Sequence, residues 1–303
     1  MKIRLPHLLG VLALAASLAD LGTTAVRHVS SFPRVAWDAR AVAAFAAALG
    51  LYMVMTVAGA TAWLLLLRAT GSPAALRAVF SVWGTAQVGK YLPGNVGQYL
   101  GRAALAQRHG IPVHWSALTF VFETTCLIVA AVVCAFVTRG GPLLATPWKL
   151  ALLAAGAVVA PFLLVHVLER WFPDVLRRRT GVDRIPRLSP GTLGSCVALY
   201  MVTFACSGLA LNLLAGGLFG AGLESAWWRV IPAFALAWVA RFVAPGAPAG
   251  LGVREALLVA GTAPLYGPGT ALSAALALRL VTVLGDGLAF LAGSVLQARF
   301  QRR

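Results

Sequence analysis

Charged residues are scarce in this sequence. They make up 11% of its 303 residues, whereas soluble globular domains average about 25%. The longest polar stretch, from Glu169 to Pro190, has only 22 residues, which leaves no room for a sizeable water-soluble domain. Any binding or chemistry is therefore expected in or beside a bilayer, and the predicted fold class is an all-α integral membrane protein.

The sequence also lacks the residue clusters of metal sites and hydrolytic enzymes. Its four cysteines and five histidines do not have metal-ligand spacing, and no Ser-His-Asp arrangement can be inferred. Residues 84–90 match the start of a phosphate-binding loop, but Tyr91 replaces the Ser or Thr that would hold magnesium. We therefore expect no metal, no cofactor, no catalytic residues and no ATP hydrolysis.

Acidic residues are few as well, nine against 25 basic ones, which gives a formal charge of +16. The basic residues are scattered between apolar segments and do not line one soluble face, so we expect no nucleic-acid partner. Membrane topology explains them better. Fourteen basic residues fall on the N-terminal side of the predicted membrane and six on the other side, which predicts that both termini are cytoplasmic.

Long apolar runs are what the sequence has in abundance. Stretches long enough to cross about 30 Å of hydrocarbon predict six transmembrane helices, at roughly 6–26, 42–67, 114–138, 150–168, 191–216 and 270–296. Two further apolar stretches, 74–109 and 227–263, are interrupted by proline, glycine and charge. Irregular backbone at membrane depth is tolerated only where protein buries it or water lines it, so each is predicted to be a re-entrant helical hairpin beside a cavity.

The two hairpins match each other at an offset of 152 residues. The matched positions are Pro93 and Gly94 with Pro245 and Gly246, and Arg102 with Arg254. We interpret this as a duplication, with repeat 1 over about 6–138, repeat 2 over about 150–296 and a basic cytoplasmic linker over 169–190. Each repeat has three spans, an odd number, so the second must be inverted. Inverted repeats with broken helices are typical of transporters.

Basic side chains in or beside the hairpins predict an anion site. These residues are Lys90, Arg102, Arg241 and Arg254. A basic group at the bilayer centre costs about 2.5–3.5 kcal/mol on insertion scales, so it rarely persists without a task. After each Pro-Gly break the backbone is expected to restart as a helix whose free N–H groups attract phosphate. The alternative is that these cations snorkel to the interface or pair structurally with Glu123, Glu255 and Asp286.

Acidic residues within the spans allow further pairing. Arg279, Thr282 and Asp286 share one helical face, which makes an Arg279–Asp286 ion pair within the membrane plausible. Glu123 is either a counter-ion for a hairpin cation or a proton carrier. Glu123, Glu255, Arg279 and Asp286 therefore join the four hairpin cations as candidate substrate-binding residues.

The hairpin segment from Lys90 to Arg102, KYLPGNVGQYLGR, resembles the signature of the lysylphosphatidylglycerol synthase transmembrane family, also called flippase-like proteins. A second family signature, usually PGGLGVRE, corresponds to residues 245–255, where Ala247 and Pro248 depart from the usual Gly-Gly. The resemblance covers essentially the whole chain. It implies movement of a lipid between leaflets of a bacterial or archaeal cytoplasmic membrane, with aminoacylated phosphatidylglycerol or polyprenyl-linked glycolipids as cargo.

The aminoacyl-transferase domain of the full-length synthases has no counterpart in the sequence. We therefore expect that the chain does not make the lipid and that a lipid-synthesising enzyme is a partner. The leading hypothesis is a flippase whose phosphate-bearing substrate engages the hairpin cavity. The alternatives are a membrane-embedded enzyme that modifies a lipid phosphate and an ion-coupled carrier of a small anion. Without an ATPase signature, transport is expected to be downhill or ion-coupled.

Overall fold

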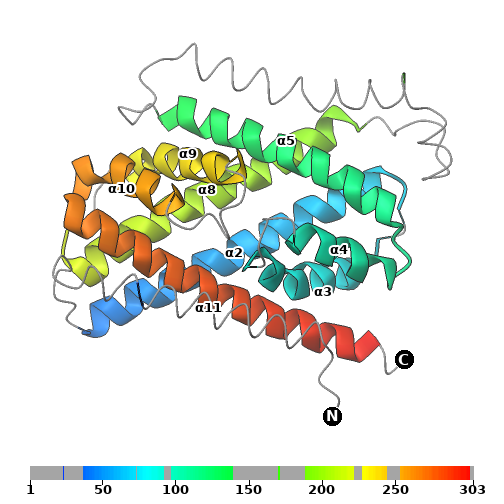
Figure 1. Cartoon of the computed structure of the whole chain (residues 1–303), viewed down its shortest axis with the longest axis horizontal. Helices are drawn as coiled ribbons and strands as arrows, with labels where there is room; N and C mark the ends of the chain where they lie inside the picture. The colour runs from blue at the N-terminus through cyan, green and yellow to red at the C-terminus, as the bar shows by residue number, and fades with distance from the viewer. Residues whose placement is uncertain are drawn as a thin grey trace.

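The computed structural model describes residues 23, 37–72, 74–91, 97–138, 170, 188–221, 227–243 and 253–300, and the regular elements within them are all helical (Figure 1). Four of these helices are long and apolar enough to cross a membrane: α2 (Ala39–Ala69), α5 (Val113–Thr138), α8 (Pro190–Phe219) and α11 (Pro268–Phe300). The shortest has 26 residues, about 39 Å at the α-helical rise. Four of the six predicted spans are thereby confirmed as helices. The other two, at 6–26 and 150–168, lie outside the described residues except for residue 23.

Local sequence signals fix the ends of these helices. The Asp38 carboxylate accepts a hydrogen bond from the Ala41 N–H at 2.8 Å at the start of α2, which satisfies one of the unpaired N–H groups there. Ser189 caps α8 in the same way, and Pro190 follows in the first turn. Gly220 then ends α8 in the left-handed conformation, with φ of 68°, which glycine adopts without a steric penalty.

Each of the two interrupted stretches forms a pair of short helices. The first contains α3 (Leu76–Ala86), the 3₁₀ segment η2 (Gln87–Tyr91) and α4 (Gly97–Gln107), and the second contains η4 (Trp227–Val230), α9 (Ile231–Val243) and α10 (Val253–Tyr266). The longest of these helices has 14 residues, about 21 Å, too short to cross about 30 Å of hydrocarbon. The predicted breaks at Pro93, Gly94, Pro245 and Gly246 lie outside the described residues.

Helices α2 and α8 correspond to each other at the offset of 152 residues, and they pack along each other in opposite directions (Figure 1). A Cβ atom added to Gly217, near the end of α8, would lie within 2.2 Å of the Ala44 Cβ, near the start of α2. Midway along both helices, the Ser207 hydroxyl donates to the Met55 sulfur at 3.6 Å, and these residues are 152 positions apart. Equivalent residues therefore meet where the helices cross, as expected for two halves related by a two-fold axis. Helices α5 and α11 also run in opposite directions (Figure 1).

Helix α3 of the first half packs closely on α11 of the second. A Cβ atom on Gly84 would lie 2.5 Å from the Ala289 carbonyl oxygen, and the Ser81 hydroxyl donates to the Gly293 carbonyl at 3.0 Å. Only glycine allows such an approach of two backbones, the small-residue packing that is common between membrane helices. This contact holds η2, which follows α3 in the chain, beside Asp286 of α11.

Candidate functional site

Two neighbouring cavities lie between the halves, one of about 200 Å³ and one of about 160 Å³. We call them the first and the second chamber. Both far exceed the roughly 10–15 Å³ that one water molecule needs. The side chains that line both chambers are Tyr52, Met55, Lys90, Leu127, Thr203 and Trp238. The chambers therefore share a wall built from both halves of the chain.

Arg102 of α4 lies in the wall of the first chamber and is 5% exposed. Its guanidinium donates to the Glu123 carboxylate of α5 at 2.7 Å. The rings of Trp63, Trp83 and Tyr99 surround it, with centroids 4.9, 4.6 and 5.0 Å from the guanidinium carbon. Cation–π contacts of this kind strengthen when they are desolvated. The charge of Arg102 is thus compensated by the protein itself.

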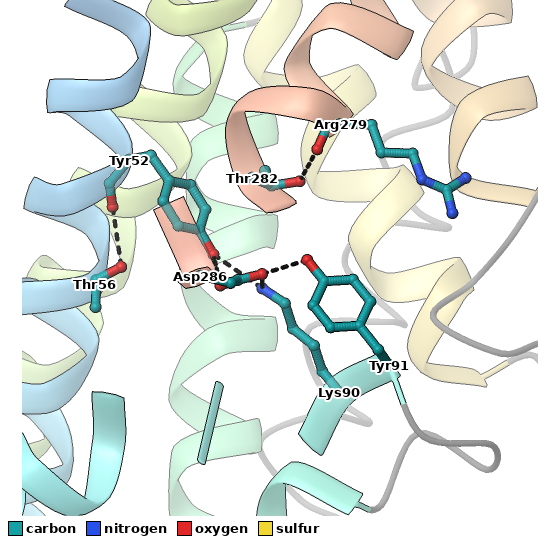
Figure 2. A network of polar contacts seen from close by, with 7 residues as sticks. All are labelled: Tyr52, Thr56, Lys90, Tyr91, Arg279, Thr282 and Asp286. Carbon is teal, nitrogen blue, oxygen red and sulfur yellow. Dashed lines mark hydrogen bonds and ion pairs between the residues drawn. The ribbon is translucent and has the colours of Figure 1, made fainter. Parts of the chain in front are cut away.

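Asp286 of α11 is fully buried and forms the centre of a four-residue network, the Asp286 cluster, with Tyr52, Lys90 and Tyr91 (Figure 2). The hydroxyls of Tyr52 and Tyr91 donate to its two carboxylate oxygens at 2.5 Å each. The Lys90 ammonium forms an ion pair with the same carboxylate and donates to the Tyr52 hydroxyl at 2.9 Å. The cluster joins α2, η2 and α11, so it links the two halves at the shared wall.

Arg254, Glu255 and Arg279 line the second chamber. Arg279 of α11 lies 3.7 Å from the Glu255 carboxylate of α10, longer than a hydrogen bond. Arg254 is half-buried, with its guanidinium carbon 5.4 Å from the centroid of the Phe234 ring. No carboxylate of the described part of the chain lies within ion-pair distance of Arg254. This arginine therefore differs from its counterpart Arg102.

The predicted ion pair between Arg279 and Asp286 does not form. Arg279 pairs with Glu255 and Asp286 pairs with Lys90, and Figure 2 shows the Arg279 side chain directed away from the cluster. The two residues share a helix face, but seven residues separate them by about 10.5 Å along the axis. Each finds a closer partner on another element. Thr282, between them, donates to the Arg279 carbonyl at 2.8 Å.

The structure brings most of the predicted site residues together, and it favours pairing for two of the four hairpin cations. Lys90 and Arg102 have carboxylate partners, as the alternative interpretation predicted, while Arg254 faces the second chamber. Arg241 lies in the last turn of α9, and its side chain is outside the described residues.

Among the described charges around the chambers, four bases and three carboxylates leave one net positive charge. The bases are Lys90, Arg102, Arg254 and Arg279, and the carboxylates are Glu123, Glu255 and Asp286.

Sequence reasoning missed the aromatic residues that hold these charges. Tyr91 directly follows Lys90 in the hairpin signature, so its position was a usable signal. Tyr52 lies 38 residues before Lys90 and 234 before Asp286. Its hydroxyl group within an apolar run was the only sequence signal that it has a polar role. Trp63 and Trp83 carried no signal for a role beside Arg102, since aromatic residues are ordinary in membrane helices.

The long apolar helices and the charged chambers between them define a multi-pass membrane protein with a buried polar site. The sequence profile of the lysylphosphatidylglycerol synthase TM region matches residues 7–289. The chain therefore belongs to this family, and a membrane function related to lipids follows. No curated protein matches the chain.

Proposed function

We propose that this protein is a lipid translocase that moves a phosphate-bearing lipid between the leaflets of a bacterial or archaeal cytoplasmic membrane, without modifying it chemically. The observation that carries the proposal is the pair of chambers between the two halves, which charged and polar side chains help to line, among helices long enough to span the bilayer. A lipid headgroup that crosses bare hydrocarbon loses its hydration, which is costly for a charged phosphate. The chambers offer polar and charged groups on this route.

In this mechanism the acyl chains stay in the hydrocarbon while the headgroup occupies the chambers. The short helices α3 with α4 and α9 with α10 act as re-entrant hairpins, each returning to its own side of the membrane, and both chain termini are cytoplasmic. The antiparallel α2–α8 crossing supports an inverted repeat, in which the halves rock about a central site and expose it to each leaflet in turn. The Asp286 cluster connects the halves in the state observed here.

Proteoliposomes that contain the purified protein test the proposal. Phospholipids with a fluorescent group on one acyl chain are placed in both leaflets, and a membrane-impermeant reductant bleaches the outer ones. We expect bleaching beyond the outer-leaflet fraction, faster than in protein-free vesicles, with no new lipid species by mass spectrometry. A new lipid species would indicate an enzyme instead, and uptake of inorganic phosphate without lipid movement would indicate an anion carrier.

A matched pair of variants separates a route through the chambers from a nonspecific leak. Thr203 lines both chambers, whereas Val202, the next residue on α8, is 43% exposed. Thr203→Phe should fill the shared wall and slow lipid movement about tenfold or more, while Val202→Phe should leave the rate unchanged. Equal rates in the two variants would show that lipid does not pass through the chambers.

A further inference from the structure

We infer that the transported headgroup is a phosphodiester of an uncharged polyol, with its phosphate bound by Arg254 in the second chamber and its hydroxyl groups in the first chamber. This inference rests on the proposed function and specifies the chemical class of its substrate. It follows from the difference between the chambers in charge, in ring contacts and in unpaired polar groups.

The described charges around the chambers suit one negative charge. Arg254 is the described cation there without a carboxylate partner, while the three carboxylates each face another base. Residues 92–96 and 244–252 contain no ionisable side chain in the sequence. A phosphodiester carries a single negative charge that Arg254 can neutralise through charge-assisted hydrogen bonds. A diphosphate would bring at least one further charge, which is costly to bury without a counter-ion.

The first chamber does not suit a cationic headgroup. Three of its aromatic rings already contact the protein's own cations, since Arg102 lies against Trp83 and Tyr99, and Lys90 lies 5.5 Å from the Tyr52 ring centroid. Glu123, the carboxylate that lines this chamber, is bonded to Arg102. An added ammonium would meet two ion pairs that are already neutralised and no free carboxylate among the described residues. Burial of this further charge without a counter-ion would be costly.

Neutral hydrogen-bonding groups remain in the first chamber. The Tyr200 hydroxyl and the Trp83 Nε1–H are buried and have no hydrogen-bond partner among the described residues, although both side chains line the chamber. A buried donor without a partner costs about 1–3 kcal/mol, so a ligand hydroxyl that accepts from it is favoured. The amides of Gln87 and Gln98 also line the chamber and can both donate and accept. A glycerol or sugar carries hydroxyls that suit these groups.

A headgroup panel in phosphatidylcholine proteoliposomes tests the inference. The panel contains phosphatidylglycerol, its lysyl ester and a diacylglycerol diphosphate, all with the same fluorescent acyl chain. We expect phosphatidylglycerol to be moved at least tenfold faster than the other two. Faster movement of the lysyl ester or of the diphosphate would overturn the inference and leave the proposed function standing. Movement of none of the three would contradict both.

Two pairs of variants locate the groups responsible. Gln98→Glu adds a negative charge to the first chamber without a change in shape, so it should shift the preference toward the lysyl ester about tenfold. Gln107→Glu makes the same change at an exposed position of the same helix and should not shift the preference.

Arg254→Gln should slow phosphatidylglycerol movement about tenfold or more, while Arg77→Gln at an exposed position should not. Unchanged preference in Gln98→Glu, or an unchanged rate in Arg254→Gln, would contradict the assigned sites.

Discussion

Arg102 and Arg254 occupy equivalent positions in the two halves of the chain, 152 residues apart, yet their surroundings differ. Arg102 is nearly inaccessible, hydrogen-bonded to Glu123 and enclosed by three aromatic rings. Arg254 is half-buried, lies near one ring, that of Phe234, and faces the second chamber. The same residue type at the same position in each half is therefore structural in one half and available to a ligand in the other.

The sequence positions that surround the two arginines explain this difference. The position equivalent to Glu123 in the second half is Ala275, so the carboxylate partner is absent there. The chain has one residue more between Arg241 and Pro245 than between Lys90 and Pro93, so Trp83 corresponds to Phe234 and the aromatic contact is retained. A cation with an aromatic contact and no counter-ion keeps its charge for an anionic ligand. The two matched arginines therefore differ because only Arg102 has a carboxylate partner at this position.

The largest effect is expected where the first-half pair is broken. Glu123→Gln leaves the buried charge of Arg102 without its counter-ion, and loss of one partner of a buried ion pair costs about 3–5 kcal/mol. We expect this loss in the free energy of unfolding, measured by denaturant titration in detergent micelles. The double variant Arg102→Leu with Glu123→Leu should recover most of the stability, because neither charge then remains. A loss below about 1 kcal/mol in Glu123→Gln would mean that the pair is not structural.

The next effect concerns the contact between the halves. Asp286→Asn removes the counter-ion of Lys90 and keeps only one of the two oxygens that accept from Tyr52 and Tyr91, so we expect a loss of about 2–4 kcal/mol. The Lys90 side chain is 15% exposed, which softens the penalty relative to Glu123→Gln. A double-mutant cycle with Lys90→Met should give a coupling energy above about 1 kcal/mol. Additive losses would show that the two residues act independently.

A smaller effect is expected at the close contact between α3 and α11. Gly84→Ala would place a Cβ atom 2.5 Å from the Ala289 carbonyl oxygen, which requires the helices to move apart. Overpacking of this kind costs about 1–3 kcal/mol. Gly287→Ala is the matched control, since a Cβ atom at this glycine of the partner helix α11 meets nothing within 4 Å. Thermal unfolding of both variants in micelles measures the difference, and equal midpoints would disprove the tight contact.

The smallest effect is expected in the second half. Glu255→Gln breaks a pair whose atoms are 3.7 Å apart, too far for a hydrogen bond. We therefore expect a loss of about 1 kcal/mol in the free energy of unfolding, well below that of Glu123→Gln. The same denaturant titration compares the two variants directly. A loss as large as that of Glu123→Gln would remove the contrast between the close Arg102–Glu123 pair and the more distant Arg279–Glu255 pair.

Much of this architecture was predictable from the sequence. The four described long helices and the two interrupted stretches follow from apolar runs and from proline and glycine, and Arg102, Glu123 and Asp286 were identified as candidate residues. Their partners were not all predictable. Arg279 and Asp286 lie on one face of α11, but the contacts of α11 with α10 and η2 decide that they pair with Glu255 and Lys90.

The sequence by itself determined that the chain is a membrane protein and that its halves correspond at an offset of 152 residues, because hydropathy and repetition are local properties of the chain. The tertiary structure decided which of the two matched arginines is neutralised. Ion pairs and cation–π contacts depend on distances of a few ångströms between residues far apart in the chain. The packing of α4 on α5 brings Arg102 to Glu123, and the packing of η2 on α11 brings Lys90 to Asp286. Arg254 is left facing the second chamber.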